Sequence, residues 1–400
     1  NVRFGVNAGN SIASGGNYNV VVGDEAGTAI TTGDRNTALG FGALASEDAH
    51  GYNVAVGYAS LNQLNAGAEG YNTAVGYAAG NNVTTGFQNT IIGGLAGDAL
   101  TDADQNVAIG YAALSGDTLG SASVAIGRKA LTTQNFTSAT TTYNVAVGYA
   151  AGELVTTGIN NTLIGGLAGD ALTDADYNVA LGYLALSTNI LGSSSVAVGS
   201  FALGTHNVAS AAETYNTAVG HNSGWAVTTG IKNTFLGGLA GDATTDADEN
   251  VAVGYNALST NILGSTSTAI GTSSLFSQNP ASAVSMYNTA VGYDSGAAVT
   301  TGTENTLIGG GAGDALTDAD YNVAVGSFAL SSDTLGSRSV ALGYGTLGSQ
   351  NFTSATNSYN IAVGHSAGNN VTTGLYNTLI GGLTGDALDV GQENVAVGYQ

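Results

Sequence analysis

The stretch Asn72-Thr-Ala-Val-Gly-Tyr-Ala-Ala-Gly80 begins with a five-residue phrase that recurs along the whole 400-residue chain. The phrase consists of a small polar residue, two or three apolar residues and a closing glycine, as at residues 106–110 and 123–127. Most of the closing glycines follow one another at the same interval, as Gly93, Gly110 and Gly127 do. A short fixed period is typical of a solenoid, in which equal coils stack and each contacts its neighbours.

A second, longer period groups the coils in fours. The blocks open at Tyr71, Tyr143, Tyr215, Tyr287 and Tyr359, and the fourth coil of each complete block has four extra residues. Before residue 71 the steps are less regular. We therefore expect irregular leading coils over residues 1–70 and regular 72-residue blocks over residues 71–400, within one continuous solenoid. The chain begins and ends inside a repeat phrase, which suggests a slice of a longer fibre.

The repeated phrase predicts a short β-strand, because it is rich in β-branched residues and ends at a glycine. A weaker pattern after each glycine, as at residues 77–80 and 111–114, predicts a second short strand. Coils stacked at the ~4.8 Å spacing of paired strands would extend over roughly 105 Å in 22 steps. The sequence thus predicts an all-β protein, a repetitive parallel β-roll or β-solenoid that forms an elongated fibre.

Composition excludes several classes of protein. The 28 acidic and 6 basic residues give a net charge of -22, which argues against nucleic acid and anionic membranes as partners. A single proline excludes collagen. No apolar run approaches the length of a membrane-spanning helix, so we expect no membrane insertion. The chain has no cysteine, so stacking and burial must stabilise it.

Both faces of the predicted strands are apolar. At residues 161–165, Thr162 and Ile164 point to one face and Leu163 to the other. A coil this short can enclose only one face, and a long exposed apolar stripe marks an interface. We therefore expect a parallel homo-oligomer with cyclic symmetry about the fibre axis.

Asparagine and tyrosine occupy fixed columns beside the strands. The simplest interpretation is a structural ladder of stacked amides and rings, with sugar binding by the rings as the alternative. The representative ladder residues are Asn72, Asn89, Asn106, Asn144, Tyr71, Tyr77, Tyr143 and Tyr149.

The phrases Ser123-Val-Ala-Ile-Gly127, Ser195-Val-Ala-Val-Gly199 and Asn144-Val-Ala-Val-Gly148 resemble the head repeats of trimeric autotransporter adhesins of the YadA type. Residues 72–80 and the Thr84-Thr-Gly86 corner look closer still to repeats of bacteriophage tail fibres. The resemblance implies a left-handed β-roll with three chains to a bundle. It further implies a non-enzymatic fibre shaft of the virion that attaches to a host-surface glycan or protein, with the head of a bacterial surface adhesin as the alternative.

The four-residue excess predicts loops at residues 131–142, 203–214, 275–286 and 347–358. Their tips vary, and variable loops on a rigid scaffold are where binding usually occurs. The alternative is that the loops cover a groove between chains or only absorb an insertion. The candidate receptor-binding residues are Asn135, Phe136, His206, Asn207, Asn279, Pro280, Asn351 and Phe352.

An acidic turn recurs in the second coil of the blocks. Three carboxylates within one short turn could bind Ca²⁺, although the spacing matches no known calcium loop. The alternative is an acidic turn whose carboxylates form Asx-type hydrogen bonds with the backbone of the turn itself. The candidate metal ligands are Asp98, Asp102, Asp104, Asp170, Asp174 and Asp176, and we expect no other cofactor.

Two further functions are alternatives to the fibre. A polysaccharide-degrading tailspike would need two carboxylates in a groove. A catalytic pair occurs once, whereas the pair Asp102 and Asp104 occurs in four blocks, its own included. We therefore expect no enzyme and no catalytic residue. An ice-binding solenoid would need threonine in every coil, but the Thr84-Thr85 pair recurs only every fourth coil.

Overall fold

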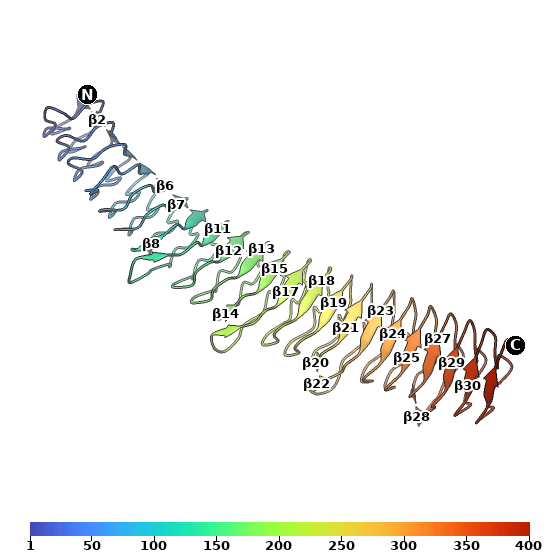
Figure 1. Ribbon diagram of the computed structural model, residues 1–400. Coiled ribbons are helices and arrows are strands. Elements are labelled where there is room, and N and C mark those ends of the chain that lie inside the picture. Colours follow the sequence, from blue (N-terminus) through green and yellow to red (C-terminus); the bar gives the residue numbers. More distant parts are fainter. The chain divides into compact units, whose positions relative to one another are not determined.

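The computed structural model covers residues 1–400, which form two compact units. The first unit contains Asn1–Ser195 and Val208–Glu213, and the second contains Val196–Asn207 and Thr214–Gln400. Each unit is a parallel β-solenoid without helices, and the chain has about 23 turns in all (Figure 1). The predicted all-β parallel solenoid is thus confirmed. No helix is present that is long and apolar enough to span a bilayer.

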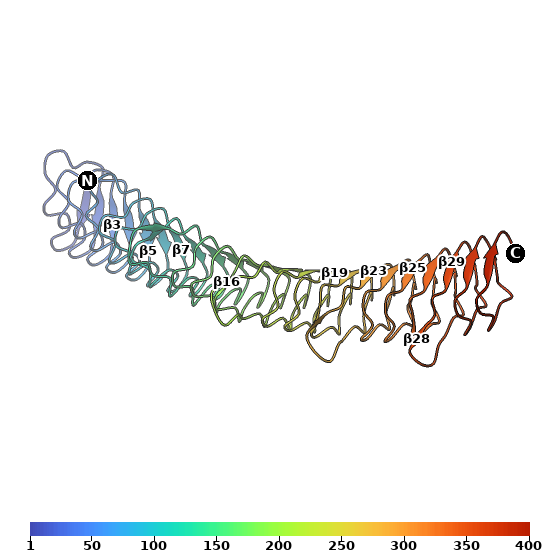
Figure 2. The same ribbon diagram turned by 60° about the horizontal axis from the view of Figure 1, so that its bottom comes forward.

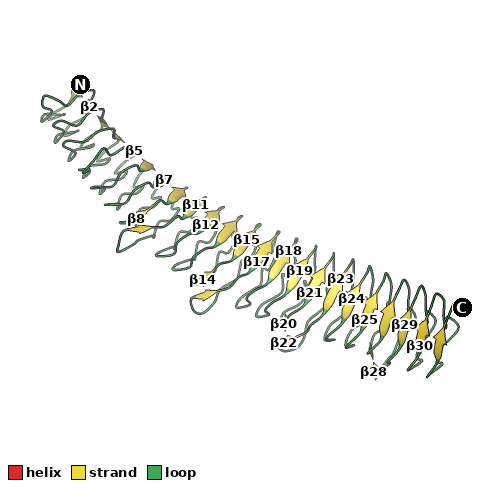
Figure 3. Cartoon of the chain, in the orientation of Figure 1, coloured by secondary structure: helices red, strands yellow, loops and turns green.

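Each coil contributes one three-residue strand to a parallel sheet along one side of its unit (Figure 3). In the first unit these strands are β1 (Val2–Phe4), β2 (Val20–Val22), β3 (Thr37–Leu39), β4 (Val54–Val56), β5 (Thr73–Val75), β6 (Thr90–Ile92), β7 (Val107–Ile109), β9 (Val124–Ile126), β11 (Val145–Val147), β12 (Thr162–Ile164) and β13 (Val179–Leu181). In the second unit they are β15 (Val196–Val198), β17 (Thr217–Val219), β18 (Thr234–Leu236), β19 (Val251–Val253), β21 (Thr268–Ile270), β23 (Thr289–Val291), β24 (Thr306–Ile308), β25 (Val323–Val325), β27 (Val340–Leu342), β29 (Ile361–Val363), β30 (Thr378–Ile380) and β31 (Val395–Val397).

Strands of successive coils pair in register. Thr90 of β6 pairs with Val107 of β7, and Ile91 pairs with Ala108. The middle residue of the triplet points into the coil and is fully buried at both positions, while the outer two face away from it. The leading strands β1–β5 pair in the same manner, so the irregular steps before residue 71 fall outside the strands.

The second strand predicted after each closing glycine is wrong, because residues 77–82 form a run of turns. Ala78 and Gly80 have φ angles of 52° and 59°, in the left-handed region that glycine adopts readily and residues with a Cβ adopt at a cost. The N–H of Ala78 donates to Tyr58 O in the preceding coil, and that of Gly80 donates to Ala96 O in the following coil. In a strand, both donors would point to the same neighbour, since residues two apart share a side.

Each inserted loop contributes a two-residue strand, which pairs with a second two-residue strand in the preceding coil. The parallel pairs of the first unit are β8 (Gly120–Ser121) with β10 (Thr140–Thr141) and β14 (Gly192–Ser193) with β16 (Ala212–Glu213). Those of the second unit are β20 (Gly264–Ser265) with β22 (Val284–Ser285) and β26 (Gly336–Ser337) with β28 (Thr356–Asn357). Figure 2 shows the two loops of the second unit extending beyond the coils on the same side.

Candidate functional site

The inserted loops combine buried anchors with exposed tips. Phe136 and Phe352 are only 6% and 5% exposed, and Pro280 and His206 are buried as well. Burial lowers the pKa of His206 to about 4, so this imidazole is neutral at pH 7. The exposed candidates are Asn135, Asn207, Asn279 and Asn351. The rest of the exposed surface of the four loops comes mainly from small and polar residues, at 137–141, 209–213, 281–285 and 353–357.

A buried polar network holds the first of these loops. Asp117 accepts hydrogen bonds from the N–H of Gly120 at 3.0 Å and from Gln134 Nε2 at 2.5 Å. Gln134 also donates to Ser123 Oγ at 2.8 Å and accepts from Asn144 Nδ2 at 2.9 Å. Every one of these side chains is fully buried, and burial raises the pKa of the Asp117 carboxyl.

The network recurs in the second unit. Gln350 Nε2 donates to Asp333 Oδ2 at 2.6 Å, and Asn360 Nδ2 donates to Gln350 Oε1 at 2.8 Å. Sequence analysis missed these residues. The available signal was an acid and a glutamine one coil apart in the stack, at 117 and 134 and again at 333 and 350. The network fixes the base of the loop, since a buried polar group without a partner is costly.

The carboxylates of the acidic turns accept hydrogen bonds from the preceding coil. Thr85 Oγ1 donates to Asp102, and the N–H of Phe87 donates to Asp104 Oδ1 at 3.0 Å. In the next block, Thr157 Oγ1 donates to Asp174 Oδ1 at 2.5 Å and the N–H of Ile159 donates to Asp176 Oδ1 at 2.7 Å. These carboxylates therefore link one coil to the next through charge-assisted hydrogen bonds.

The first carboxylate of each acidic turn lies apart from these hydrogen bonds. Asp98 and Asp170 are half-buried, and one oxygen of each, Oδ1, is buried without a hydrogen-bond partner. Burial raises the pKa of both carboxyls, that of Asp170 to about 6. The three aspartates of each turn thus occupy different environments.

The asparagine column lies inside the coils. Asn72 and Asn89 are fully buried, and Asn72 Oδ1 accepts the N–H of Asn89 at 3.0 Å while its Nδ2 donates to Gly86 O at 2.9 Å. Asn106 continues this pattern, because its N–H donates to Asn89 Oδ1 at 2.9 Å. Asn144 has the same position in the next block and donates to Gly158 O at 2.7 Å.

The tyrosine columns lie outside the coils. Tyr71, Tyr77, Tyr143 and Tyr149 are each more than half exposed. Where two rings fall in successive coils they stack, and the ring centroids of Tyr58 and Tyr77 are 5.3 Å apart. Elsewhere glycine interrupts the column, as at Gly94 between Tyr77 and Tyr111.

The outward face of the sheet is partly exposed and apolar. The third residue of many strands is a large aliphatic one, and Ile92, Leu181 and Ile380 are 38%, 43% and 41% exposed. The tyrosine columns lie on either side of these strands in the sequence, directly before the asparagine and directly after the closing glycine. Each unit therefore presents an apolar band next to aromatic rings.

Two of the surface hollows in the second unit lie beside a glycine that directly follows a leucine in the sequence. One has a volume of about 260 Å³ and is lined by Phe201, His221, Asn222 and Trp225. The other has a volume of about 280 Å³, and its lining includes Phe328, Ser331, Tyr344, Ser349, Ser366 and Asn369. A Cβ at Gly204 would lie 3.0 Å from Trp225 Cδ1, and one at Gly348 would lie 2.6 Å from Asn369 Oδ1.

These hollows were also missed by sequence analysis. In the four successive blocks, the loop position after the leucine is Thr132, Gly204, Phe276 and Gly348. Glycine therefore alternates with larger residues at this position. That alternation was the available signal. An exposed aromatic ring beside amide and hydroxyl groups can stack on an apolar ligand face while the polar groups bond its edge.

No protein-family model matches the sequence, and a comparison with curated proteins also finds no match.

Proposed function

We propose that this chain is the shaft of a homotrimeric extracellular fibre with an adhesive, non-enzymatic role. The observation that carries the proposal is the exposed aliphatic third residue of the strands, such as Ile92 and Leu181, in a band beside the tyrosine columns. Contiguous exposed apolar surfaces often mark interfaces between proteins. Sister copies of the chain offer the same repeat and can match the band along its length, as cyclic symmetry requires.

Resemblance of the phrases at residues 72–80 and 123–127 to phage tail-fibre and adhesin-head repeats supports the same proposal. We favour a left-handed trimeric tail fibre of a virion that attaches to a host surface. The head of a bacterial surface adhesin is the second form of the same function. It would use an identical trimer.

Oligomeric state tests the trimer. Sedimentation and light scattering of the full chain should give three times the chain mass of 39.3 kDa. A double variant, Ile92→Lys with Leu181→Lys, should lower the mass, because it places two charges on the outward strand face. The matched control is Thr137→Lys, which adds a charge at an exposed loop tip. A wild-type monomer would refute the proposal.

The receptor chemistry that fits the second unit is a neutral saccharide. Trp225 and Tyr344 are 46% and 53% exposed and offer rings for stacking, while Asn222 and Asn369 offer amides. Neither hollow is lined by a carboxylate, lysine or arginine, so neither selects for a charged sugar. Saccharides bind to such sites through apolar ring faces and hydroxyl edges.

A glycan array with the full chain tests this receptor class. Trp225→Ala and Tyr344→Ala together should abolish binding to neutral glycans. Tyr255→Ala is the matched control, since it removes an exposed ring that follows a closing glycine but lines neither hollow. Equal binding by the double variant and the wild type would exclude the hollows as receptor sites.

A further inference from the structure

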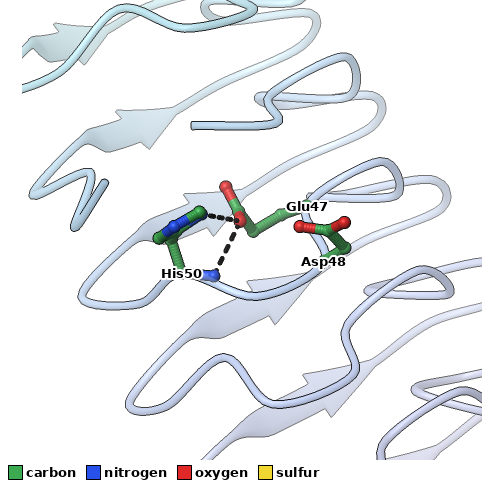
Figure 4. Close-up of side chains that lie close together, drawn as sticks. All are labelled: Glu47, Asp48 and His50. Carbon is green, nitrogen blue, oxygen red and sulfur yellow. Dashed lines mark hydrogen bonds and ion pairs between the residues drawn. The ribbon is translucent and has the colours of Figure 1, made fainter. Parts of the chain in front are cut away.

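One turn of the first unit brings together three metal-ligating side chains. Glu47, Asp48 and His50 lie on the same corner, and one ligand atom from each lies within 4.8 Å of the other two (Figure 4). Glu47 is fully buried, Asp48 is partly exposed, and the His50 side chain is 29% exposed. The corner is part of the leading coils and has no copy in the later blocks.

Glu47 occupies the place of Asp117 and Asp333. Each of the three carboxylates accepts the N–H of the residue three positions later at 3.0 Å. Each also accepts an N–H from the next coil, at 3.2 Å from Ala66, 3.4 Å from Phe136 and 3.1 Å from Phe352. The repeats therefore provide internal comparisons for this corner.

One hydrogen bond of the comparison corners is absent at Glu47. Asp117 and Asp333 each receive an amide donor from a glutamine one coil later, at 2.5 Å and 2.6 Å. The residue at the same distance along the chain from Glu47 is Leu64, which is buried and has no donor. A buried carboxylate needs compensating positive charge or donors, and the Glu47 carboxylate accepts one hydrogen bond fewer than its counterparts.

His50 stands where the comparison corners have Gly120 and Gly336. Its Nδ1 atom is buried and makes no hydrogen bond, and it lies 3.7 Å from Glu47 Oε1. That separation is too long for a hydrogen bond. It suits two ligands of one ion, since ligands at ~2.1 Å from a zinc ion are separated by at most ~4.2 Å.

We propose that Glu47, Asp48 and His50 bind one Zn²⁺ ion. Imidazole nitrogen with carboxylate oxygens is a donor set that zinc accepts, whereas Ca²⁺ and Mg²⁺ prefer oxygen alone. At the Glu47 corner the Zn²⁺ ion stabilises the buried carboxylate. At Asp117 and Asp333 the amide groups of Gln134 and Gln350 do so instead. Water completes the coordination on the exposed side, next to Asp48. The ion then holds the corner of the leading coils closed.

Titration calorimetry with ZnCl₂ on the full chain, after treatment with a chelator, tests the site. We expect one strong zinc site per chain and at least tenfold weaker binding of CaCl₂ and MgCl₂. His50→Gln should weaken zinc binding at least tenfold. His365→Gln, which changes an exposed histidine outside any acidic cluster, should leave it unchanged.

Two further measurements keep the test decisive. Asp48→Asn alters a partly exposed side chain that does not support the core, so it should fold and should also weaken zinc binding. Zinc should slow amide hydrogen exchange at residues 47–51 and at Ala66 in the wild type. Unchanged zinc affinity in both His50→Gln and Asp48→Asn, or the same loss in His365→Gln, overturns the proposal.

Discussion

The closing glycine of each coil is the residue on which stacking depends most directly. Gly165 has a φ angle of 140°, which residues with a Cβ rarely adopt, and a Cβ there would lie 2.4 Å from Gly182 O. Its N–H donates to Val147 O in the preceding coil at 2.8 Å. Glycine is thus required by conformation and by the close approach of the next coil.

We predict that Gly165→Ala destabilises the surrounding coils by about 3 kcal/mol or more, since backbone strain and the clash add together. Amide hydrogen exchange of strands β11–β13 measures this local opening. Gly166→Ala is the matched control, because a Cβ there would meet only Tyr183 Cδ2 at 3.6 Å. Equal effects of the two substitutions would contradict the argument.

A second prediction concerns Asp170, whose pKa burial raises to about 6. The folded state then binds more protons than the unfolded state between about pH 4 and pH 6, so this carboxyl lowers stability as the pH rises through that window. Asp170→Asn should be more stable than the wild type at pH 8, by up to ~1 kcal/mol after solvent screening. The difference should shrink toward pH 4.

Urea unfolding at pH 4, 6 and 8 measures the Asp170 effect. Glu304→Gln is the control, because this exposed residue is in no acidic turn. If Asp170→Asn is less stable than the wild type at pH 8, the folded state stabilises the ionised carboxylate, which contradicts the prediction.

At the scale of a coil, core packing depends on the sizes of two side chains, the middle residue of the strand and the turn residue that faces it. Leu163, in the middle of β12, is fully buried between two turn glycines, and a Cβ at either Gly152 or Gly169 would lie 2.7 Å from a Leu163 methyl group. Where the turn carries leucine instead, as at Leu114 and Leu131, the neighbouring strand residues Ala108 and Ala125 are small. Large and small residues therefore exchange places between strand and turn.

Leu163→Ala should accordingly destabilise the first unit by about 2–5 kcal/mol, because the glycines beside it cannot fill the cavity. Thermal and urea unfolding of the full chain measure the loss. Leu154→Ala is the control, since Leu154 is 49% exposed on a corner. If Leu163→Ala destabilises the protein less than Leu154→Ala does, the coil has rearranged to fill the cavity, which contradicts the prediction.

Much of the coil could be predicted from the sequence, because one strand with a closing glycine is a local pattern repeated many times. The prediction of a second strand was wrong because residue identity does not distinguish an extended from a left-handed backbone here: Ala78, Lys129 and Leu167 occupy the same position in their coils and all have positive φ angles. Periodicity alone does not separate the two. The buried anchors of the loops were also missed, because nothing in the sequence next to Phe136 shows that its N–H donates to Asp117 in the preceding coil.

At the scale of the whole molecule, charge and the apolar band act in opposite directions. Each chain carries a net charge of -22, so a bundle of three copies carries three times that charge. The copies therefore repel one another. The outward band around Ile92 and Leu181 attracts them through apolar burial, which salt does not screen. Association in the proposed trimer should therefore strengthen as the ionic strength rises.

We predict that raising NaCl from about 10 mM to about 150 mM shortens the screening length from ~30 Å to ~8 Å and tightens the trimer on the order of tenfold. Sedimentation equilibrium over a dilution series measures the change. The Ile92→Lys and Leu181→Lys variant should need more salt than Thr137→Lys to reach the same trimer fraction. Dissociation on adding salt would instead show that ion pairs between copies, rather than the apolar band, hold the chains together.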